Sequence, residues 1–312
     1  MLRHLILPLL LTACTTAPAP VSPTTAAPEA TANRSPCAPA AGLAALGDER
    51  ARSEVVLDMT QTSREELALS LLPCLADPAP ILRDGVTYTT LSQMMRSKLI
   101  GPETVAAIKD DLLAVLAGPE DEDGFARPFA ALALAEVART DRIDPWMAPE
   151  ERDALIAAAH TYLAGLTDYR GFSDKEGWRH GVAHTGDLLM QLSLNHALTR
   201  SQAEAILAAI AAKVAPHEHA YIFGESERLA APVLYLAQRQ NFAPDEWDAW
   251  FASLWPADDP LRQNVYGSEA ALRKLHNLRA FSEAVYVSAI ASNEETYEPL
   301  ARSSFALLNS LP

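Results

Sequence analysis

The stretch PEERDALIAAAHTYLAGL, residues 149–166, is the clearest indication of the fold class. It starts with proline, which suits the first turn of a helix because its missing N–H would have no partner there. Alanine, leucine and glutamate, which favour helices, make up most of the remainder. The stretch PETVAAIKDDLLAVLAG, residues 102–118, has the same design. Both stretches predict helices that open on a proline.

Helix-start signals recur along the chain. Ser63 with Glu66 has the spacing of a capping box, and Ser201, Pro244 and Asn293 mark later starts. Successive starts are about 39 to 50 residues apart, and each interval has room for a second helix, as in HEAT-type repeats. The second helices are expected at about residues 80–97, 125–140, 178–197, 225–241 and 267–292.

These repeats predict an all-α, HEAT-like α-solenoid of stacked antiparallel helix pairs over residues 42–312. Each pair would bury its apolar side only by stacking on its neighbours, and the chain is longer than one compact core usually serves. The alternative is an irregular all-α domain. The segment SEVVLDM, residues 53–59, is the only β-like run, and one run cannot form a sheet.

Composition argues against two large classes of protein. The chain has 312 residues, of which 49% are hydrophobic and 21% are charged. Its mean hydropathy is close to zero and its long apolar run lies at the N-terminus, which argues against a polytopic membrane protein. The 40 Asp and Glu against 25 Lys and Arg give a net charge of −15. Nucleic acid is therefore not an expected partner, because its phosphates would be repelled.

Residues 1–13 are similar to a bacterial lipoprotein signal peptide. Arg3 and His4 form a short basic head, residues 5–11 are apolar, and LTAC at residues 11–14 resembles a lipobox. The resemblance implies cleavage before Cys14 and its acylation, which would anchor the protein in the cell envelope, facing the periplasm. Threonine after this cysteine favours the outer membrane if the cell is Gram-negative. The alternative is a secretory signal that is cut elsewhere.

Residues 14–41 comprise the lipidated cysteine and a tether of proline, alanine and threonine. The tether has almost no large apolar side chains, so burial cannot offset the cost of ordering it, and it is expected to be disordered. Cys37 and Cys74 remain as a pair in an oxidising compartment. They either form a disulfide, which closes a loop of about 38 residues and contributes roughly 4 kcal/mol, or Cys74 is a small buried apolar residue.

An arginine stands near the start of each expected second helix, with acidic residues close by. The arginines are Arg83, Arg127, Arg179, Arg228 and Arg273. The acidic residues are Asp84, Asp123, Asp174, Glu225 and Glu227. In stacked repeats such residues usually form hydrogen bonds and ion pairs between repeats. The alternative is that a row of arginines along one groove holds an anionic ligand.

The stretch DYRGFSDKEGWRHGVAHTGDLLMQL, residues 168–192, is the richest in chemically active side chains. A glycine-bearing loop is followed by a helix that is expected to begin near Trp178. At about 100° per residue, one stripe of this helix about 60° wide collects four polar residues, which are His180, His184, Asp187 and Gln191. The large apolar residues lie near the opposite side. The two imidazoles are therefore expected to line a groove rather than fill the core.

Two histidines four residues apart on a helix can bind one metal ion, and Asp187 would be a third ligand. The HExxH motif of zinc proteases has glutamate where this chain has Gly181, so hydrolysis of that type lacks its base. Further ligands would come from His217, His219, Glu122 or Asp123. The alternative is a pair of histidines that form hydrogen bonds within the protein.

Four segments resemble a bacterial family known as domain of unknown function 2785. They are LRDGVTYTTLSQMM (82–95), FARPFAALALAEV (125–137), DYRGFSDKEGWRHGVAHTGDLL (168–189) and GESERLA (224–230). The residues that carry the resemblance are Arg127, Arg170, Gly171, Gly177, Trp178, His180, Ala183, His184, Asp187 and Arg228. Pro128 departs from the expected serine and would shorten the start of its helix. The resemblance implies an all-helical repeat with a shared site and names no reaction.

Two functions from different classes are therefore expected. The first is a lipid-anchored binding module that holds an envelope protein, a peptide or a small anionic ligand in its groove. The second is a metal-dependent, hydrolase-like enzyme using a divalent metal at His180, His184 and Asp187; no motif establishes a cofactor. The candidate groove residues are Arg127, Arg170, Trp178, Arg179, His180, His184, Asp187 and Arg228.

Overall fold

Helices make up nearly all of the part of the chain that the computed structural model describes, residues 37–312. The predicted all-α fold is confirmed. The signal peptide (1–13), Cys14 and the tether up to residue 36 lie outside the described residues. Within the described part, no helix combines the length and the apolar character needed to cross a membrane.

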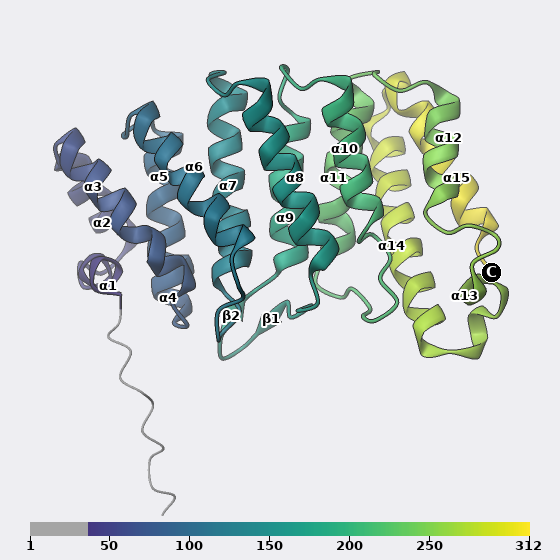
Figure 1. Cartoon of the computed structure of the whole chain (residues 1–312), viewed down its shortest axis with the longest axis horizontal. Helices are drawn as coiled ribbons and strands as arrows, with labels where there is room; N and C mark the ends of the chain where they lie inside the picture. The colour runs from purple at the N-terminus through teal and green to yellow at the C-terminus, as the bar shows by residue number, and fades with distance from the viewer. Residues whose placement is uncertain (1–36) are drawn as a thin grey trace, which may run out of the picture. The chain divides into compact units, whose positions relative to one another are not determined.

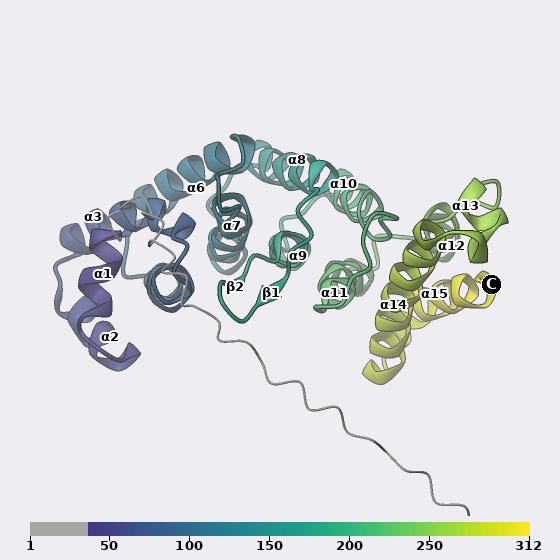
Figure 2. The ribbon, with the colours of Figure 1, turned by 90° about the horizontal axis from the view of Figure 1, so that it is seen from below.

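Two curved rows of helices form the middle of the molecule (Figure 2). The outer row contains α6 (Pro102–Ala117), α8 (Pro149–Gly165) and α10 (Arg200–Ala211). The inner row contains α7 (Ala126–Ile143), α9 (Gly181–Ser193) and α11 (Glu225–Gln238). Consecutive helices alternate between the rows, α7 packs on α9 and α9 on α11, so the arrangement is solenoid-like.

Shorter helices precede α6 along the chain (Figure 1). They are α1 (Ala38–Ala44), α2 (Glu49–Asp58), α3 (Gln61–Leu71), the 3-10 helix η1 (Leu72–Ala76), α4 (Pro80–Leu82), the π-helical η2 (Arg83–Tyr88) and α5 (Thr89–Arg96). The segment from Pro80 to Arg96 is one helical stretch whose middle is wider than an α-helix. It packs on η1 and α7 and so extends the inner row.

The C-terminal part continues both rows. It contains α12 (Pro244–Ser253), α13 (Pro260–Gln263), the 3-10 turns η3 (Val265–Gly267) and η4 (Glu295–Tyr297), α14 (Glu269–Ser292) and α15 (Glu298–Ser310). The long helix α14 packs on α11 and on α15, while α12 packs on α15. The described chain thus ends in a helix that is packed against its two neighbours.

Proline identified three helix starts correctly, whereas other start signals were misplaced. Helices α6, α8 and α12 begin at Pro102, Pro149 and Pro244. Helix α3 is capped by Thr60 rather than by Ser63, because the Thr60 hydroxyl accepts from the backbone N–H three residues on. Asn293 ends α14 in a left-handed conformation instead of starting a helix.

Two local expectations at the N-terminal end need correction. The β-like run 53–59 lies mostly in α2, where tertiary packing of Val56, which is 1% exposed, overrides its strand propensity. Helix α1 begins at Ala38, so the last residues of the expected disordered tether are helical. Cys37, just before α1, is joined to Cys74 in η1 by a disulfide with a Cα–Cα distance of 5.6 Å, which ties this helix to the first turns of the domain.

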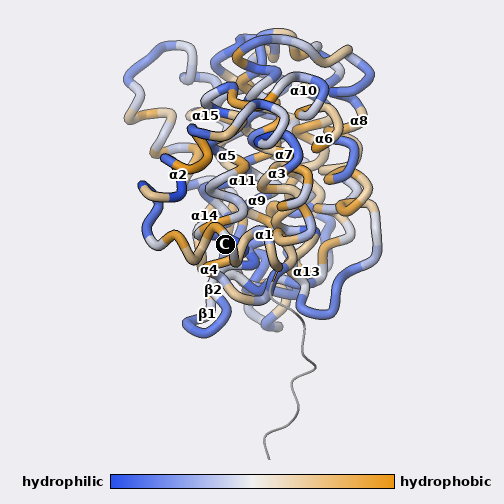
Figure 3. The backbone as a smooth tube through the Cα atoms, turned by 90° about the vertical axis from the view of Figure 1, so that its left-hand side faces the viewer, coloured by the Kyte–Doolittle hydropathy of each residue, from blue (hydrophilic) through white to orange (hydrophobic). Residues whose placement is uncertain are grey.

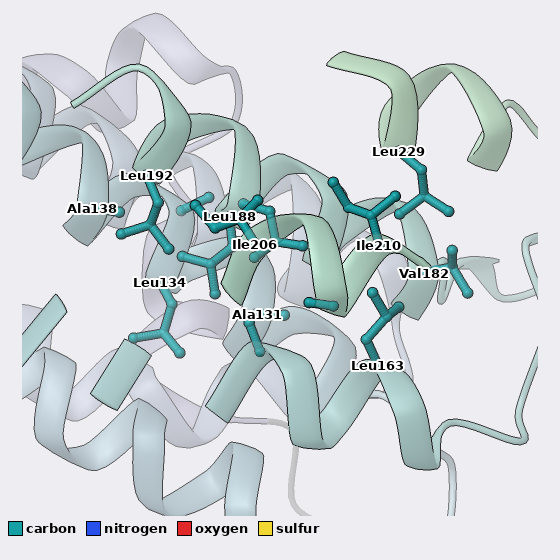
Figure 4. Close-up of a cluster of buried hydrophobic side chains, with 14 of the residues drawn as sticks. Ala131, Leu134, Ala138, Leu163, Val182, Leu188, Leu192, Ile206, Ile210 and Leu229 are labelled. Atoms are coloured by element: carbon teal, nitrogen blue, oxygen red, sulfur yellow. The ribbon is translucent and has the colours of Figure 1, made fainter. Parts of the chain in front are cut away.

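Apolar side chains from both rows interdigitate in one core. Figure 4 shows Leu134 of α7, Leu163 of α8, Leu188 of α9, Ile206 of α10 and Leu229 of α11 in this region. All five are fully buried. Along the chain, hydrophobic segments recur in the helices while hydrophilic ones dominate the loops (Figure 3). The inner helices are covered by this core on their outer side, so their exposed side chains face the inner side of the curve.

Candidate functional site

A short hairpin between α8 and α9 sets the position of the candidate site. Strand β1 (Phe172–Ser173) pairs in antiparallel fashion with β2 (Gly177–Trp178), and the hairpin lies beside the first turns of α7 and α9 (Figure 2). Gly177 has a φ of +70°, which glycine adopts without steric cost. The backbone N–H of His180 donates to the carbonyl of Arg170 over 3.0 Å, which extends the pairing to the start of α9.

Two buried arginines hold the hairpin against the start of α7. The guanidinium carbons of Arg83 and Arg179 lie over the ring of Phe125, 3.8 and 4.2 Å from its centre. Arg83 also donates to the carbonyl of Glu176 in the hairpin, and Arg179 to the carboxylate of the same residue. Both guanidinium groups are therefore engaged in contacts within the protein. Arg179, expected in the groove, is 4% exposed and serves this structural contact instead.

His180 combines burial, backbone strain and an unpaired nitrogen. It has φ 53° and ψ 39°, a left-handed conformation that costs a residue with a side chain about 1–2 kcal/mol. As a result α9 begins at Gly181 rather than near Trp178. The His180 ring is stacked on Trp178 with centres 4.6 Å apart, and its Nε2 is buried with no hydrogen-bond partner in the described part of the chain. Strain and unpaired polar atoms of this kind concentrate at functional sites.

A second buried polar group faces this nitrogen. Oε1 of Glu225, the first residue of α11, lies 3.7 Å from His180 Nε2, and the glutamate is 2% exposed. Burial, and next the positive charge of Arg228, lower the pKa of His180 to about 4, while a backbone hydrogen bond with Phe223 acts in the other direction. The carboxylate of Glu225 also accepts from the backbone N–H of Phe223 over 2.8 Å, so Glu225 has a hydrogen-bond partner whereas His180 Nε2 has none among the described residues.

His184 lies beneath His180, one turn along α9, and is fully engaged with α7. Its Nδ1 is 3.1 Å from the carbonyl of Pro128, and its ring meets Phe129 edge-on with centres 5.1 Å apart. Burial, and next the neighbouring His180, lower the pKa of His184 to about 3. The expectation that this imidazole lines a groove is therefore wrong, because it packs between two inner helices. Pro128 does not shorten α7, which begins at Ala126.

Asp187 of α9 and Arg228 of α11 form an ion pair on the inner side of the curve. Arg228 Nη1 lies 2.7 Å from Oδ1 and 2.5 Å from Oδ2 of Asp187. The arginine side chain is 51% exposed and the carboxylate 15%. Burial raises the pKa of Asp187, which the charge of Arg228 opposes. Half of the Arg228 side chain remains accessible to a ligand, and Trp178, which stacks on His180, is 38% exposed.

A glycine and a proline bring α9 and α11 close enough for this pair. A Cβ on Gly186 would lie 2.9 Å from the carbonyl oxygen of Arg228, so only glycine fits without a shift of α11. Pro232 lies inside α11 and has no N–H to donate to that carbonyl. The two helix backbones therefore meet where the internal hydrogen bonding of α11 is interrupted.

The remaining predicted groove residues lie in separate surroundings. Arg127 lies over the ring of Tyr162 in α8, 4.7 Å from its centre, and donates to the carbonyl of Leu116 in α6, so it joins the outer row. Arg170 pairs with Asp168 in the loop before β1. The structure thus brings together Trp178, His180, Asp187 and Arg228, with His184 beneath them, and separates Arg127, Arg170 and Arg179 from that group.

The acidic partners of the arginine row differ from those expected. Arg83 lies 3.5 Å from Asp84, as expected, but Arg179 pairs with Glu176 and Arg228 with Asp187. In the last repeat Arg273 pairs with Glu269. Only the Arg228 pair joins two helices of the inner row. Arg83 and Arg179 therefore share Phe125, whereas Arg127, Arg228 and Arg273 each make separate local contacts.

The geometry around His180 gives little support to a metal centre. Among residues 37–312, no three histidine, cysteine or acidic side chains lie together in a way that could hold a metal ion. Nδ1 of His184 is occupied by Pro128, and both oxygens of Asp187 face Arg228. His217 is exposed beside Glu218, and His219 is stacked on Tyr169. The side chains that were expected to bind one metal ion therefore each make other contacts.

Glu225 and Phe223 are the site residues whose role the sequence did not reveal. Glu225 was considered only as a partner for Arg228, because an acidic residue in the first turn of a helix is usually exposed. Phe223 meets Trp178 edge-on, with centres 6.1 Å apart, and a Cβ on Gly171 would fall 2.1 Å from the Phe223 ring. The glycine in the expected loop was the available signal of this close approach.

The fold and the site define a helical repeat protein with a polar cluster on the inner side of its solenoid. The chain belongs to the family described as protein of unknown function (DUF2785), whose model matches residues 112–287. This confirms the resemblance inferred from the sequence, and the match runs from α6 into α14 and includes the whole cluster around His180. Comparisons with curated proteins and with solved structures gave no match.

Proposed function

We propose that the protein is a lipid-anchored binding module of the cell envelope, which holds a partner on the inner side of its solenoid. The observation that carries the proposal is the unpaired Nε2 of buried His180, which faces the buried carboxylate of Glu225 at 3.7 Å. Leaving such a nitrogen without a partner costs about 1–3 kcal/mol. A polar group of a bound partner that reaches Nε2 would recover that cost.

Neighbouring side chains favour a partner with an anionic group. The half-exposed guanidinium of Arg228 lies next to the cluster, and it can bind a carboxylate or phosphate with two parallel hydrogen bonds. Trp178 covers the His180 ring and offers a partly exposed aromatic face. The candidate partners are an envelope protein, a peptide or a small anionic ligand. The overall charge of −15 argues against nucleic acid.

The location rests on the N-terminal sequence. Acylation at Cys14 would hold the protein in the membrane, with the helical domain facing the periplasm, and the outer membrane is favoured in a Gram-negative cell. Labelling of cells with radioactive palmitate tests this step. The full chain should incorporate label, and a Cys14→Ser variant should not. Equal labelling of the two chains would refute the anchor without bearing on the inner site.

The binding role is tested by affinity capture with the full chain from detergent-solubilised envelope. The wild type should enrich a partner at least about tenfold over Arg228→Gln, since this arginine is the accessible cation of the site. Arg302→Gln is a matched control, because Arg302 is 56% exposed and pairs with Asp248 between α12 and α15. Equal enrichment by wild type and Arg228→Gln would contradict the proposal, provided that their circular dichroism spectra agree.

The metal-dependent enzyme has no specific observation in its favour. The residues expected to bind the metal make other contacts, as described above. We therefore carry forward the binding role alone.

A further inference from the structure

A separate pocket lies at the end of α7 opposite to the hairpin. It has a volume of about 500 Å³ and is bounded by the start of α3, the α5–α6 connection and the last turn of α7. The hairpin contacts the first residues of α7, and this 18-residue helix spans roughly 27 Å. The pocket is therefore distinct from the cluster around His180, and nothing in the proposed function uses it.

Cationic side chains are concentrated around this pocket although the protein is strongly acidic. Arg64, Arg96, Lys98 and Arg139 line it, and Asp144 is the one acidic residue among the lining side chains of the described chain. Glu65 of α3 and Glu103 of α6 lie near Gly101, and Glu65 accepts hydrogen bonds from Gln61 and from the backbone of Gly101. The lining side chains thus comprise four cations and one carboxylate, with other acidic groups close by.

Within the described part of the chain, two of these cations form no ion pair. The guanidinium of Arg64 donates to the carbonyls of Leu57, Met59 and Leu99, which are neutral. Arg139 has no hydrogen bond or ion pair to any of residues 37–312, and its charge lowers the pKa of nearby Arg142.

The other two cations are already balanced by acidic groups. Arg96 is paired with the buried carboxylate of Glu136, and Lys98 with the exposed Asp144 over 3.0 Å. Arg139 is therefore the cation best placed to receive an anion.

The rest of the wall is apolar and held in place. Trp146 donates from Nε1 to the hydroxyl of Thr140 over 2.9 Å, and its backbone N–H donates to Asp141, so its ring has a fixed position. Ile143 is 53% exposed at the same wall, while Val105 and Met95 are buried behind it. An exposed isoleucine beside a fixed tryptophan leaves apolar surface in contact with water, and a ligand could cover it.

We propose that this pocket binds a single-chain amphipathic anion. The anionic head would contact Arg139, and the apolar chain would lie against Trp146 and Ile143. The volume of about 500 Å³ falls within the range of small-molecule sites, which are typically apolar with a few polar groups that fix orientation. A carboxylate and a phosphate monoester share the required chemistry, and both are included in the test.

The test uses the full chain in its own membranes and a dodecanoate probe that carries a diazirine group. Ultraviolet light should attach the probe to peptides that contain residues 139–146. Excess laurate or dodecyl phosphate should reduce labelling at least about fivefold, and the stronger competitor identifies the preferred head group. Dodecanol and inorganic phosphate, which each lack one half of the ligand, should leave labelling unchanged.

Two variants connect the labelling to the pocket. Arg139→Gln removes the unpaired cation and should reduce labelling at least about fivefold, while Ile143→Trp fills the mouth of the pocket from an exposed position and should also reduce it. Arg302→Gln is the control and should label as the wild type does. Competition by dodecanol as strong as that by laurate, or unchanged labelling of Arg139→Gln, would overturn the proposal, even if the inner site around His180 binds its partner.

Discussion

The Nε2 atom of His180 lies 3.7 Å from Oε1 of Glu225, and no described residue donates a hydrogen bond to that nitrogen. The two residues come from different repeats, at the starts of α9 and α11. The hairpin positions His180 and the start of α11 positions Glu225. The distance between them therefore depends on how the two repeats pack. Because buried His180 Nε2 is left without a hydrogen-bond partner, a polar group of a bound partner would satisfy it.

The left-handed backbone of His180 should lower the free energy of unfolding, and glycine at this position should avoid that loss. We expect His180→Gly to be more stable than His180→Ala by about 1 kcal/mol, because both lose the imidazole but only alanine retains the steric strain. Urea unfolding at pH 7 measures the difference. Equal free energies of unfolding would show that this backbone conformation is not maintained in solution.

The close approach of α9 and α11 should not tolerate a side chain at Gly186. In Gly186→Ala the new methyl group would lie 2.9 Å from the Arg228 carbonyl, and we expect a loss of about 1–3 kcal/mol in the free energy of unfolding. Gly165→Ala is the matched control, since a Cβ there meets nothing within 4 Å, and it should be neutral or stabilising. Thermal unfolding of the two variants would refute the contact if Gly186→Ala were as stable as Gly165→Ala.

Acidification should destabilise the fold through His184. Its pKa is about 3 in the folded protein and about 6.5 when unfolded, so the unfolded chain binds the proton first as the pH falls. The stability is fully present above about pH 6.5 and is lost as the pH falls toward 3. Between pH 7 and pH 4.5 we expect this ring alone to account for roughly 2–3 kcal/mol.

The variant His184→Asn isolates this effect, because asparagine can still donate to the Pro128 carbonyl and does not titrate. Denaturant unfolding at the two pH values should show a smaller loss in the variant than in the wild type. The same loss in both proteins would mean that His184 is not buried in its neutral form.

The ring of Phe125 should contribute more than its apolar area, because two guanidinium groups lie over it. We expect Phe125→Leu to lose about 1 kcal/mol more than Phe251→Leu, whose equally buried ring contacts other aromatic rings and no cation. Urea unfolding of both variants is the measurement. A smaller loss for Phe125→Leu would indicate that Arg83 and Arg179 do not depend on this ring.

Local signals were sufficient to predict the class of fold. Proline at the first turn placed three helix starts at their observed residues, and the spacing of those starts predicted pairs of helices. Capping was less informative where Thr60 and Ser63 stand close together, because either hydroxyl suits a helix start. Asn293 was ambiguous for the same kind of reason, since asparagine is common both before a helix and in the left-handed residue that ends one.

The candidate site was harder to predict because its members meet only through packing between repeats. The expected stripe included His180, which precedes the first turn of α9 in a left-handed conformation, and helical geometry alone could not show that His184 turns toward Pro128. Arg127, Arg179 and Arg228 all stand near the start of an expected helix. Arg127 nevertheless packs over the ring of Tyr162, and Arg179 packs over the ring of Phe125. Glu225 was expected only as an acidic neighbour of an arginine, because its burial arises from packing that the local sequence does not show.

Site-specific photo-crosslinking in the cell tests whether a partner binds at the inner site. A benzophenone amino acid is introduced at Trp178 in the full chain in cells, and adducts of any mass are measured by mass spectrometry after irradiation. The account predicts a light-dependent adduct that falls at least about tenfold when Arg228→Gln is added, and none when the same group replaces Phe305, which is similarly exposed on α15. No adduct at position 178, or one that is unaffected by Arg228→Gln, would contradict binding at the inner site.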